Sequence, residues 1–262
     1  MNEKILIEAK NISCKFGSKN VLSGIDWKIS SGENWVVFGL NGSGKTTLLS
    51  VVAAYYGVSN GLLSIMNQIV TKQNRKELRK KIGFVSTSFF NRYYKYESVL
   101  DIVLSAKFGH FGIENSISSE DIRCAKHILN EWGLKNKYQY PYDLLSQGQQ
   151  QKVLFARSIF MQPEILILDE PCSGMDLLSK EHFIKCISEK SKKEGATLIY
   201  VSHNPEEFSS VFNRALLIKN GAVHSQGDIK KIFLSSNMSD FIGMPVTVDW
   251  FEDRPSIRFA RY

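Results

Sequence analysis

The sequence contains no long apolar segment. None of its apolar runs approaches the roughly 18 residues that a membrane-spanning helix needs, although 43% of its 262 residues are hydrophobic. Residues 1–8 also lack the apolar core of a secretory signal, because Glu3, Lys4 and Glu8 carry charges there. We therefore expect neither a transmembrane helix nor a signal peptide, and we predict a cytoplasmic location.

Cysteine is scarce as well. The four cysteines stand at positions 14, 124, 172 and 186, and no two of them have the spacing of metal ligands. This pattern is typical of reduced thiols in a cytosolic protein. The net charge is +7, yet no basic run is long enough to indicate a nucleic-acid or anionic membrane surface. A surface with excess lysine is therefore the favoured explanation of the charge.

The most informative stretch is residues 34–57, whose middle reads G-x-x-x-x-G-K-T. An apolar run at 35–38 predicts a buried strand before it. Apolar residues at helical spacing follow it and predict a helix that stops at Gly57. The phosphate-binding loop and the first residues of the following helix are Gly39, Leu40, Asn41, Gly42, Ser43, Gly44, Lys45, Thr46 and Thr47.

A glycine loop between a buried strand and a helix N-terminus favours anions, because free backbone N–H groups and the helix dipole point at them. In this motif Lys45 reaches the β- and γ-phosphates and the hydroxyl of Thr46 binds Mg²⁺. The alternative is a chance match in a glycine-containing turn. The strand before the loop and the helix after it favour nucleotide binding.

The remaining periodicity predicts an α/β fold. Alternating apolar and polar residues at 5–13 and 25–29 predict an antiparallel sheet with one solvent-exposed face. Buried strands at 35–38, 165–168 and 197–201 alternate with helices, which favours a mostly parallel, doubly wound sheet. Residues 97–137 predict a helical insert, with a helix that starts near Ser118. Asn-Gly at 220–221 predicts a hairpin turn, and a second hairpin is expected within 236–262, with its turn at 252–255.

Two further polar clusters carry chemistry. Asp169 and Glu170 follow a buried strand, so Asp169 can hold Mg²⁺ and Glu170 can orient and polarise water. Ordinary strand-end caps are the alternative for this pair. The second cluster, residues 145–151, places Ser146 and Gly148 at a helix N-terminus, where either an anion site or a plain polar cap is expected.

Together these motifs resemble those of the ATP-binding-cassette (ABC) ATPases, over about residues 4–235. Residues 39–46 match Walker A and residues 165–170 match Walker B. The remaining matches are the signature at Leu145, Ser146, Gln147, Gly148 and Gln149, with Gln147 in place of the first glycine, the D-loop at 173–176, the switch histidine His203 and the adenine-stacking Phe16.

The resemblance implies a P-loop NTPase of the ABC type, with an antiparallel β subdomain, a RecA-like parallel-sheet core and a helical insert. Residues 1–262 would form a single ABC ATPase domain. Its nucleotide-binding core would comprise about 4–88 and 146–235, its helical subdomain about 90–145, and its C-terminal hairpin extension about 236–262.

The resemblance also implies a mechanism. Two copies would pair head to tail around two ATP molecules, as a homodimer. Lys45, Thr46 and Asp169 of one copy would bind each ATP and its Mg²⁺, and Ser146 and Gly148 of the other would complete the site. Glu170 would activate water and His203 would contact the γ-phosphate. Binding would close the dimer and hydrolysis would open it.

One position departs from the family pattern. The family usually has a glutamine after the strand at 82–86, which touches Mg²⁺ and relays the nucleotide state to a membrane partner. This chain has Thr87 there. Either Thr87 or Ser88 is a metal ligand through its hydroxyl, or the coupling to the partner is altered.

Two functions compete. The first is the ATPase subunit of a transporter, peripheral on the inner face of the cell membrane, driving separate permease subunits in import or export. Its cargo would be a metal complex or an oxyanion. The second is a soluble ABC ATPase that acts on nucleic acid or ribosomes, which the basic charge and Thr87 favour. A nucleotide-binding module without turnover would lack Glu170 or His203, and both are present.

Overall fold

The computed structural model describes residues 4–114 and 116–259. The chain begins with a long antiparallel hairpin of β1 (Ile5–Phe16) and β2 (Lys19–Ser30). The strands β4 (Asn60–Ile65) and β5 (Gln68–Ile69) extend this sheet in the order β2-β1-β4-β5. The predicted antiparallel sheet is confirmed, although its first two strands run several residues beyond 5–13 and 25–29.

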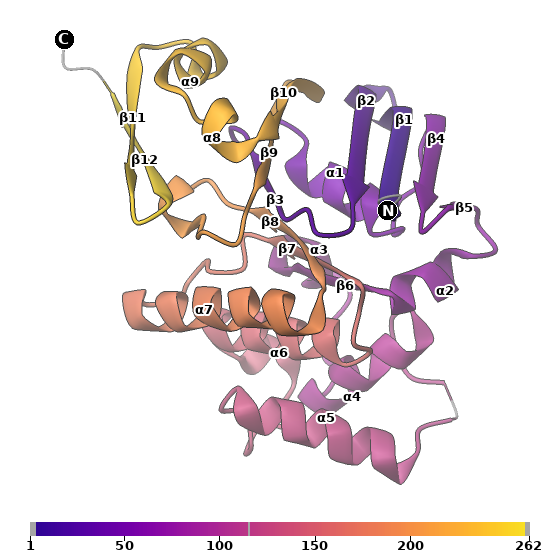
Figure 1. Cartoon of the computed structure of the whole chain (residues 1–262). Coiled ribbons are helices and arrows are strands. Elements are labelled where there is room, and N and C mark those ends of the chain that lie inside the picture. Colours follow the sequence, from indigo (N-terminus) through magenta and orange to yellow (C-terminus); the bar gives the residue numbers. More distant parts are fainter. Residues whose placement is uncertain (1–3, 115, 260–262) are drawn as a thin grey trace.

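A six-stranded sheet forms the core, in the order β10-β9-β3-β8-β7-β6 (Figure 1). Its strands are β3 (Trp35–Phe38), β6 (Ile82–Ser86), β7 (Ile165–Asp169), β8 (Thr197–Val201), β9 (Arg214–Lys219) and β10 (Ala222–Asp228). All neighbouring pairs are parallel except β9 and β10. These two strands meet at Asn220 and Gly221, which both have positive φ, at 52° and 77°. Both the parallel sheet and the Asn-Gly hairpin turn are thus confirmed.

The register of the parallel strands brings three residues to one edge of the core sheet. Ser86, at the end of β6, pairs with Asp169, at the end of β7, and Asp169 pairs with Val201, at the end of β8. Carboxyl ends of parallel strands are where open α/β sheets bind their ligands. The chain therefore presents a polar edge beside the loop that follows β3.

The first helix, α1 (Lys45–Val52), ends earlier than the predicted stop at Gly57. Ala54 has a positive φ of 61°, which turns the chain out of the helix. The guanidinium of Arg79, in the following helix α2 (Arg75–Lys80), donates two hydrogen bonds to the carbonyl of Ala54, at 2.9 and 2.8 Å. A side chain distant in sequence therefore supports the turn that ends α1.

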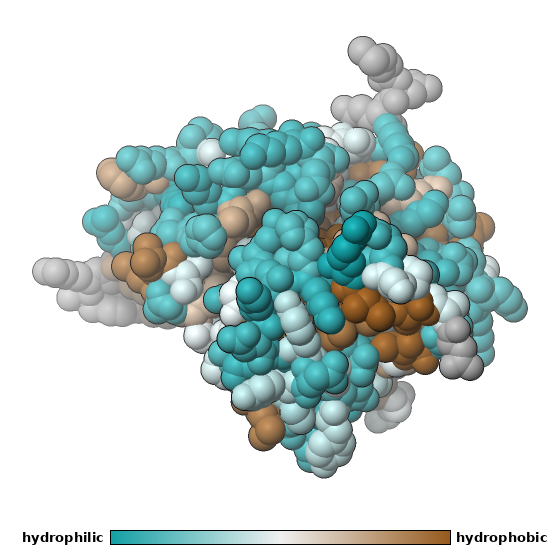
Figure 2. Space-filling model, turned by 90° about the horizontal axis from the view of Figure 1, so that it is seen from below, coloured by the Kyte–Doolittle hydropathy of each residue, from teal (hydrophilic) through white to brown (hydrophobic). Residues whose placement is uncertain are grey.

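The predicted helical insert lies between β6 and β7 and occupies the lower part of Figure 1. It contains α3 (Thr87–Phe90), α4 (Val99–Leu104), η1 (Ser105–Phe108), α5 (Ser119–Glu131) and η2 (Tyr142–Leu144). Ser118 caps α5 as predicted, in a capping box with Asp121. Seen from below, the surface is mostly hydrophilic, with a compact hydrophobic patch right of the centre and smaller hydrophobic areas elsewhere (Figure 2).

The chain returns to the core through α6 (Gln147–Ile159), and α7 (Leu177–Glu194) connects β7 to β8. A short turn, η3 (Pro205–Glu207), follows β8. Among the helices described, none is long and apolar enough to cross a membrane.

The last elements are α8 (Ile229–Ile232), α9 (Ser235–Ile242) and the hairpin of β11 (Val246–Phe251) and β12 (Arg254–Phe259). The terminal hairpin is confirmed, but its turn is shorter than the expected 252–255. Glu252 and Asp253 alone form it, with φ of 46° and 60°, so Arg254 and Pro255 belong to β12. In Figure 1 the hairpin lies beside α8 and α9, and β12 also contacts η3.

Candidate functional site

The loop between β3 and α1 is held by the hairpin turn of β9 and β10. The backbone N–H of Gly221 donates to the carbonyl of Ser43 at 3.0 Å, and the N–H of Ser23 on β2 donates to the carbonyl of Gly221 at 2.9 Å. A Cβ at Gly39 would lie 2.5 Å from the carbonyl oxygen of Ile218 on β9. Only glycine fits at this first position of the loop, because the backbones approach so closely.

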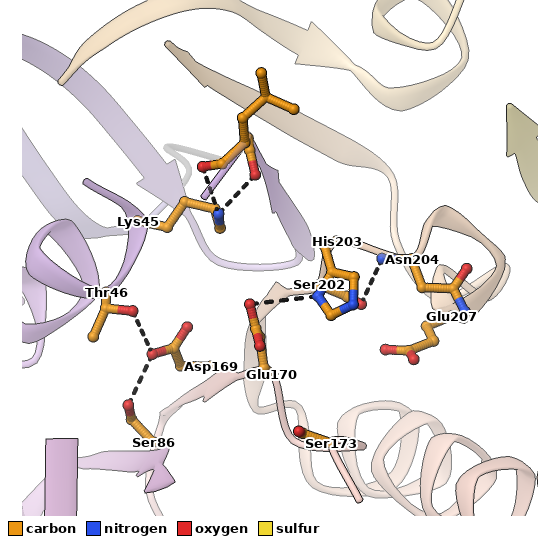
Figure 3. A network of polar contacts seen from close by, with 12 residues as sticks. Lys45, Thr46, Ser86, Asp169, Glu170, Ser173, Ser202, His203, Asn204 and Glu207 are labelled. Atoms are coloured by element: carbon orange, nitrogen blue, oxygen red, sulfur yellow. Dashed lines mark hydrogen bonds and ion pairs between the residues drawn. The ribbon is translucent and has the colours of Figure 1, made fainter. Parts of the chain in front are cut away.

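Lys45 lies folded onto this loop. Its buried side chain donates from Nζ to the carbonyls of Gly39, at 2.6 Å, and Leu40, at 3.1 Å (Figure 3). Burial lowers the pKa of Lys45, and the carboxylates of Glu170 and Asp169 oppose that shift. The ammonium group is therefore held beside the N-terminus of α1. Its positive charge and the positive end of the helix dipole both favour an anion there.

Two hydroxyls converge on one carboxylate oxygen at the edge of the sheet. Thr46 Oγ1 donates to Asp169 Oδ2 at 2.9 Å, and Ser86 Oγ donates to the same oxygen at 2.8 Å (Figure 3). Burial raises the pKa of Asp169, and these two hydrogen bonds oppose the rise. A carboxylate and hydroxyls are the hard oxygen ligands that Mg²⁺ prefers. The sequence motifs predict Thr46 and Asp169 at this site but not Ser86, whose one signal is its place at the end of a strand.

Glu170 and His203 lie side by side, each just beyond a strand end. The Glu170 carboxylate is 3.5 Å from Nδ1 of His203 (Figure 3). Glu170 takes a positive φ of 49°, and its backbone N–H donates to the carbonyl of Val201 at 2.9 Å. Such a conformation is strained for a residue with a side chain and is typical of functional sites. It turns the carboxylate away from the sheet and toward His203.

A cavity of 560 Å³ lies beside Glu170. Its lining comprises Thr46, Thr87, Ser88, Asn91, Gln147, Gln150, Gln151, Asp169, Glu170 and Ser173. The predicted site residues Thr46, Thr87, Gln147, Asp169 and Glu170 are thus brought together around one cavity. Of the other predicted site residues, Phe16 lies apart, with its ring edge-on to Tyr56 at 5.2 Å.

Two buried hydroxyls at the site, Ser43 Oγ and Thr87 Oγ1, have no hydrogen-bond partner within the described part of the chain. Buried polar atoms are costly without a partner. Their positions, one in the loop and one in the cavity wall, fit a ligand rich in oxygen, such as a phosphate chain with a hydrated cation. The donor set therefore agrees with the expected nucleotide and Mg²⁺.

The N-terminus of α6 is tied to the segment after Glu170. Ser146 and Gln149 form a capping box. Gln147 Nε2 donates to Ser173 Oγ at 3.0 Å, and its side chain covers Gly174, where a Cβ would lie 2.7 Å from Gln147 Oε1. Gln147 thus contacts the D-loop region of its own chain, a contact for which the sequence carries no motif.

A family model described as "ABC transporter" matches residues 22–173. The uncharacterized ABC transporter ATP-binding protein YlmA of Bacillus subtilis (strain 168) is 36% identical over 258 residues, which are 98% of each protein. The chain belongs to the ABC transporter family. The predicted family is thereby confirmed.

Solved structures of ABC proteins share the fold. A protein described as a metal-chelate type ABC transporter, in an inward-facing conformation, aligns with a TM-score of 0.75 at 23% identity, over 98% of this chain and 97% of its own. A dimeric bacterial ABC transporter cassette aligns with a TM-score of 0.75 at 24% identity, over 86% and 99%. The ABC-type α/β fold is confirmed, and the chain is an ATP-binding, ATP-hydrolysing ABC transporter subunit.

Proposed function

We propose that this ABC subunit works as a head-to-tail homodimer that binds two ATP molecules with Mg²⁺ and drives separate membrane permease subunits from the inner face of the membrane. The observation that carries the proposal is the cluster of Lys45, Thr46, Asp169, Glu170 and His203 at one edge of the core sheet. The dimeric state of a cassette with the same fold supports the pairing.

We assign the roles of the residues as follows. The backbone N–H groups of residues 39–47 and the ammonium of Lys45 bind the phosphates, and Phe16 stacks on adenine. Thr46, Asp169 and Thr87 hold Mg²⁺, which neutralises charge on the phosphates when bound. Residues 146–149 contact the nucleotide of the partner protomer.

We assign ATP hydrolysis to Glu170 and His203, which lie side by side. We expect Glu170 to orient and polarise water for in-line attack; in support, Glu170 lines the cavity and its carboxylate does not share the hydrogen bond between Thr46 and Asp169. His203 Nδ1 lies 3.5 Å from that carboxylate, and we expect His203 to contact the γ-phosphate. Closure on ATP and opening after hydrolysis would transmit work to the permease.

We further propose that residues 1–262 are one ABC ATPase domain. Its core comprises about 4–88 and 146–235, its helical subdomain about 90–145 and its hairpin extension about 236–262. The cargo stays the predicted metal complex or oxyanion. Action on nucleic acid or ribosomes is the alternative, and the family membership favours transport.

A pull-down from native membranes tests the function. Affinity-tagged Glu170→Gln, which should hold ATP, is expected to recover an integral membrane protein in stoichiometric amounts, and Lys45→Ala to recover less with ATP. Recovery of ribosomal proteins or RNA instead would contradict the transport proposal. Growth and uptake assays with chelated metals and oxyanions would then test the cargo.

A further inference from the structure

The C-terminal hairpin is joined to α7 by a two-pronged ion pair. The two terminal nitrogens of Arg254 on β12 donate to the two carboxylate oxygens of Glu181, at 2.7 and 2.8 Å. The pair lowers the pKa of Glu181 and raises that of Arg254, so both groups stay charged. Partly exposed pairs contribute little stability, but a bidentate pair fixes the geometry of the elements that carry it.

The same hairpin also holds the segment that follows His203. Arg254 donates to the backbone carbonyl of Glu206 at 3.4 Å, and the Ser256 hydroxyl donates to the Glu206 carboxylate at 3.3 Å. Arg254 therefore contacts two elements at once, α7 through Glu181 and η3 through Glu206. Such a clamp limits how far η3 can move from α7.

Beneath the clamp, a buried network joins the same two elements. The Glu207 carboxylate is buried; it accepts from the Tyr200 hydroxyl at 2.9 Å and pairs with Lys180 on α7 at 3.0 Å. The Tyr200 hydroxyl also lies 3.3 Å from the Cys172 sulfur, two residues beyond Glu170. The network thus links η3 and α7 to the segments around both Glu170 and His203.

A short series of hydrogen bonds leads from Glu206 back to the loop that carries His203. The Glu206 N–H donates to Asn204 Oδ1 at 3.2 Å, and the Asn204 N–H donates to Ser202 Oγ at 2.9 Å. Figure 3 shows Ser202, His203 and Asn204 lying between Glu170 and Glu207. Holding Glu206 therefore restrains the residue that faces Glu170.

We propose that Arg254 is a positioning residue for ATP hydrolysis: by clamping α7 to η3, it fixes His203 at its place beside Glu170. The inference concerns hydrolysis and not transport, and it rests on the roles proposed above for Glu170 and His203. Arg254 touches neither, so its effect must travel through Glu206 and the loop.

The test compares two arginines of one strand in the full chain. Arg254→Ala should lower kcat roughly tenfold, because a misplacement of about 1 Å can cost up to about 100-fold in rate. Its KM and its Kd for ATP should stay within about twofold, since the phosphate loop is remote from the hairpin. The matched control is Arg258→Ala, because Arg258 pairs with Asp249 of the same hairpin at 3.6 Å; its kcat should stay as in the wild type.

Two further readouts separate positioning from damage to the fold. Hydrogen exchange of residues 202–207 should quicken in Arg254→Ala and not in Arg258→Ala. The charge swap, Arg254→Glu with Glu181→Arg, should recover much of the kcat that either single change loses, whereas Arg254→Lys should recover only part because lysine lacks the planar fork.

Three results would overturn the inference: an unchanged kcat and exchange rate in Arg254→Ala, a fall in ATP affinity that matches the fall in rate, or an equal loss in Arg258→Ala. His203→Ala, measured in parallel, distinguishes this from a failure of the proposed site. If His203→Ala lowers kcat and Arg254→Ala does not, the clamp is wrong and the site stands; if neither lowers it, the His203 assignment fails as well.

Discussion

The Glu170 carboxylate lies 3.5 Å from Nδ1 of His203, although 33 positions separate the two residues (203 − 170). The contact depends on backbone geometry at both ends. Glu170 takes a left-handed conformation and hydrogen-bonds to Val201, the last residue of β8, two positions before His203. The ends of β7 and β8 therefore place a carboxylate and an imidazole side by side.

Glu170→Gln is expected to abolish most ATP turnover while ATP still binds. Glutamine keeps the shape and the hydrogen bonding of the side chain but removes its negative charge and its basicity. General base catalysis by such a carboxylate contributes a factor of about 10²–10⁴ to the rate. With hydrolysis blocked, the ATP-bound dimer should accumulate. The measurement pairs the ATPase rate with the mass on size exclusion, with and without ATP.

Either half of that result can fail on its own. A Glu170→Gln protein that hydrolyses ATP at the wild-type rate would remove Glu170 from the catalytic site. An inactive protein that never dimerises with ATP would leave the catalytic role in place and contradict the sandwiched dimer.

Phe16→Ala is expected to weaken ATP binding by roughly tenfold or more, because stacking a base on an aromatic ring contributes about 1–3 kcal/mol. Phe16 is 46% exposed, and its ring meets that of Tyr56 in a T-shaped contact with the centroids 5.2 Å apart, so the fold should survive the loss of the ring. Equilibrium titration with a fluorescent ATP analogue measures the change. An unaltered affinity would separate Phe16 from the nucleotide site.

Local patterns in the sequence were enough to predict most of the elements. Apolar runs and turn residues identified β3, β7, β8 and the Asn-Gly hairpin, and Ser118 marked the start of α5, because each signal lies within a few residues of its element. The order of the motifs then predicted the family and, with it, the placement of Lys45 beside Asp169 and Glu170.

The contacts that the sequence did not reveal join residues far apart in the chain. Ser86 reaches Asp169, Gln147 reaches Ser173, and Arg254 reaches Glu181. Each contact depends on the tertiary arrangement of the elements, such as strand register or the docking of the hairpin. This arrangement leaves no local pattern in the sequence. Glu252 and Asp253 show the same limit, since a two-residue turn with positive φ there carries no glycine to announce it.

Arg157 is expected to hold the helical insert against the core. Its guanidinium is buried on α6, lies 5.0 Å from the centre of the Phe90 ring and donates to Ser105 Oγ at 3.1 Å. Arg157→Ala should lower the free energy of unfolding by about 2–4 kcal/mol, because it leaves a cavity and removes the buried hydrogen bond to Ser105. Equilibrium unfolding in urea measures this change in the free energy of unfolding.

A matched control is available on the surface of the same insert. Arg123 on α5 pairs with Glu120, and both side chains are exposed, so Arg123→Ala should change the unfolding free energy by less than about 0.5 kcal/mol. Arg157→Lys should restore little, because an ammonium cannot stack on the ring as a guanidinium does. Equal stability of Arg157→Ala and Arg123→Ala would refute the structural role.

Thr87 and Ser88 are the two candidates for the position where the family has glutamine, and the structure separates them. Ser88 Oγ is hydrogen-bonded to Ser86 Oγ at 3.1 Å, whereas Thr87 Oγ1 is buried with no partner among residues 4–114 and 116–259. Both residues line the same cavity as Thr46 and Asp169. We therefore expect the hydroxyl of Thr87, and not that of Ser88, to serve the metal.

Thr87→Ala should raise the Mg²⁺ concentration for half-maximal ATPase activity by roughly tenfold, in the range seen when a supporting group of a metal site is removed. Thr87→Ser keeps the hydroxyl and should titrate like the wild type, which separates the loss of the oxygen from the loss of packing. Ser88→Ala should also titrate like the wild type. The Mg²⁺ titration is run at saturating ATP, so that nucleotide affinity does not enter. If Ser88→Ala shifts the curve and Thr87→Ala does not, the assignment must be exchanged, because the oxygen that reaches the metal would then be the one already bonded to Ser86.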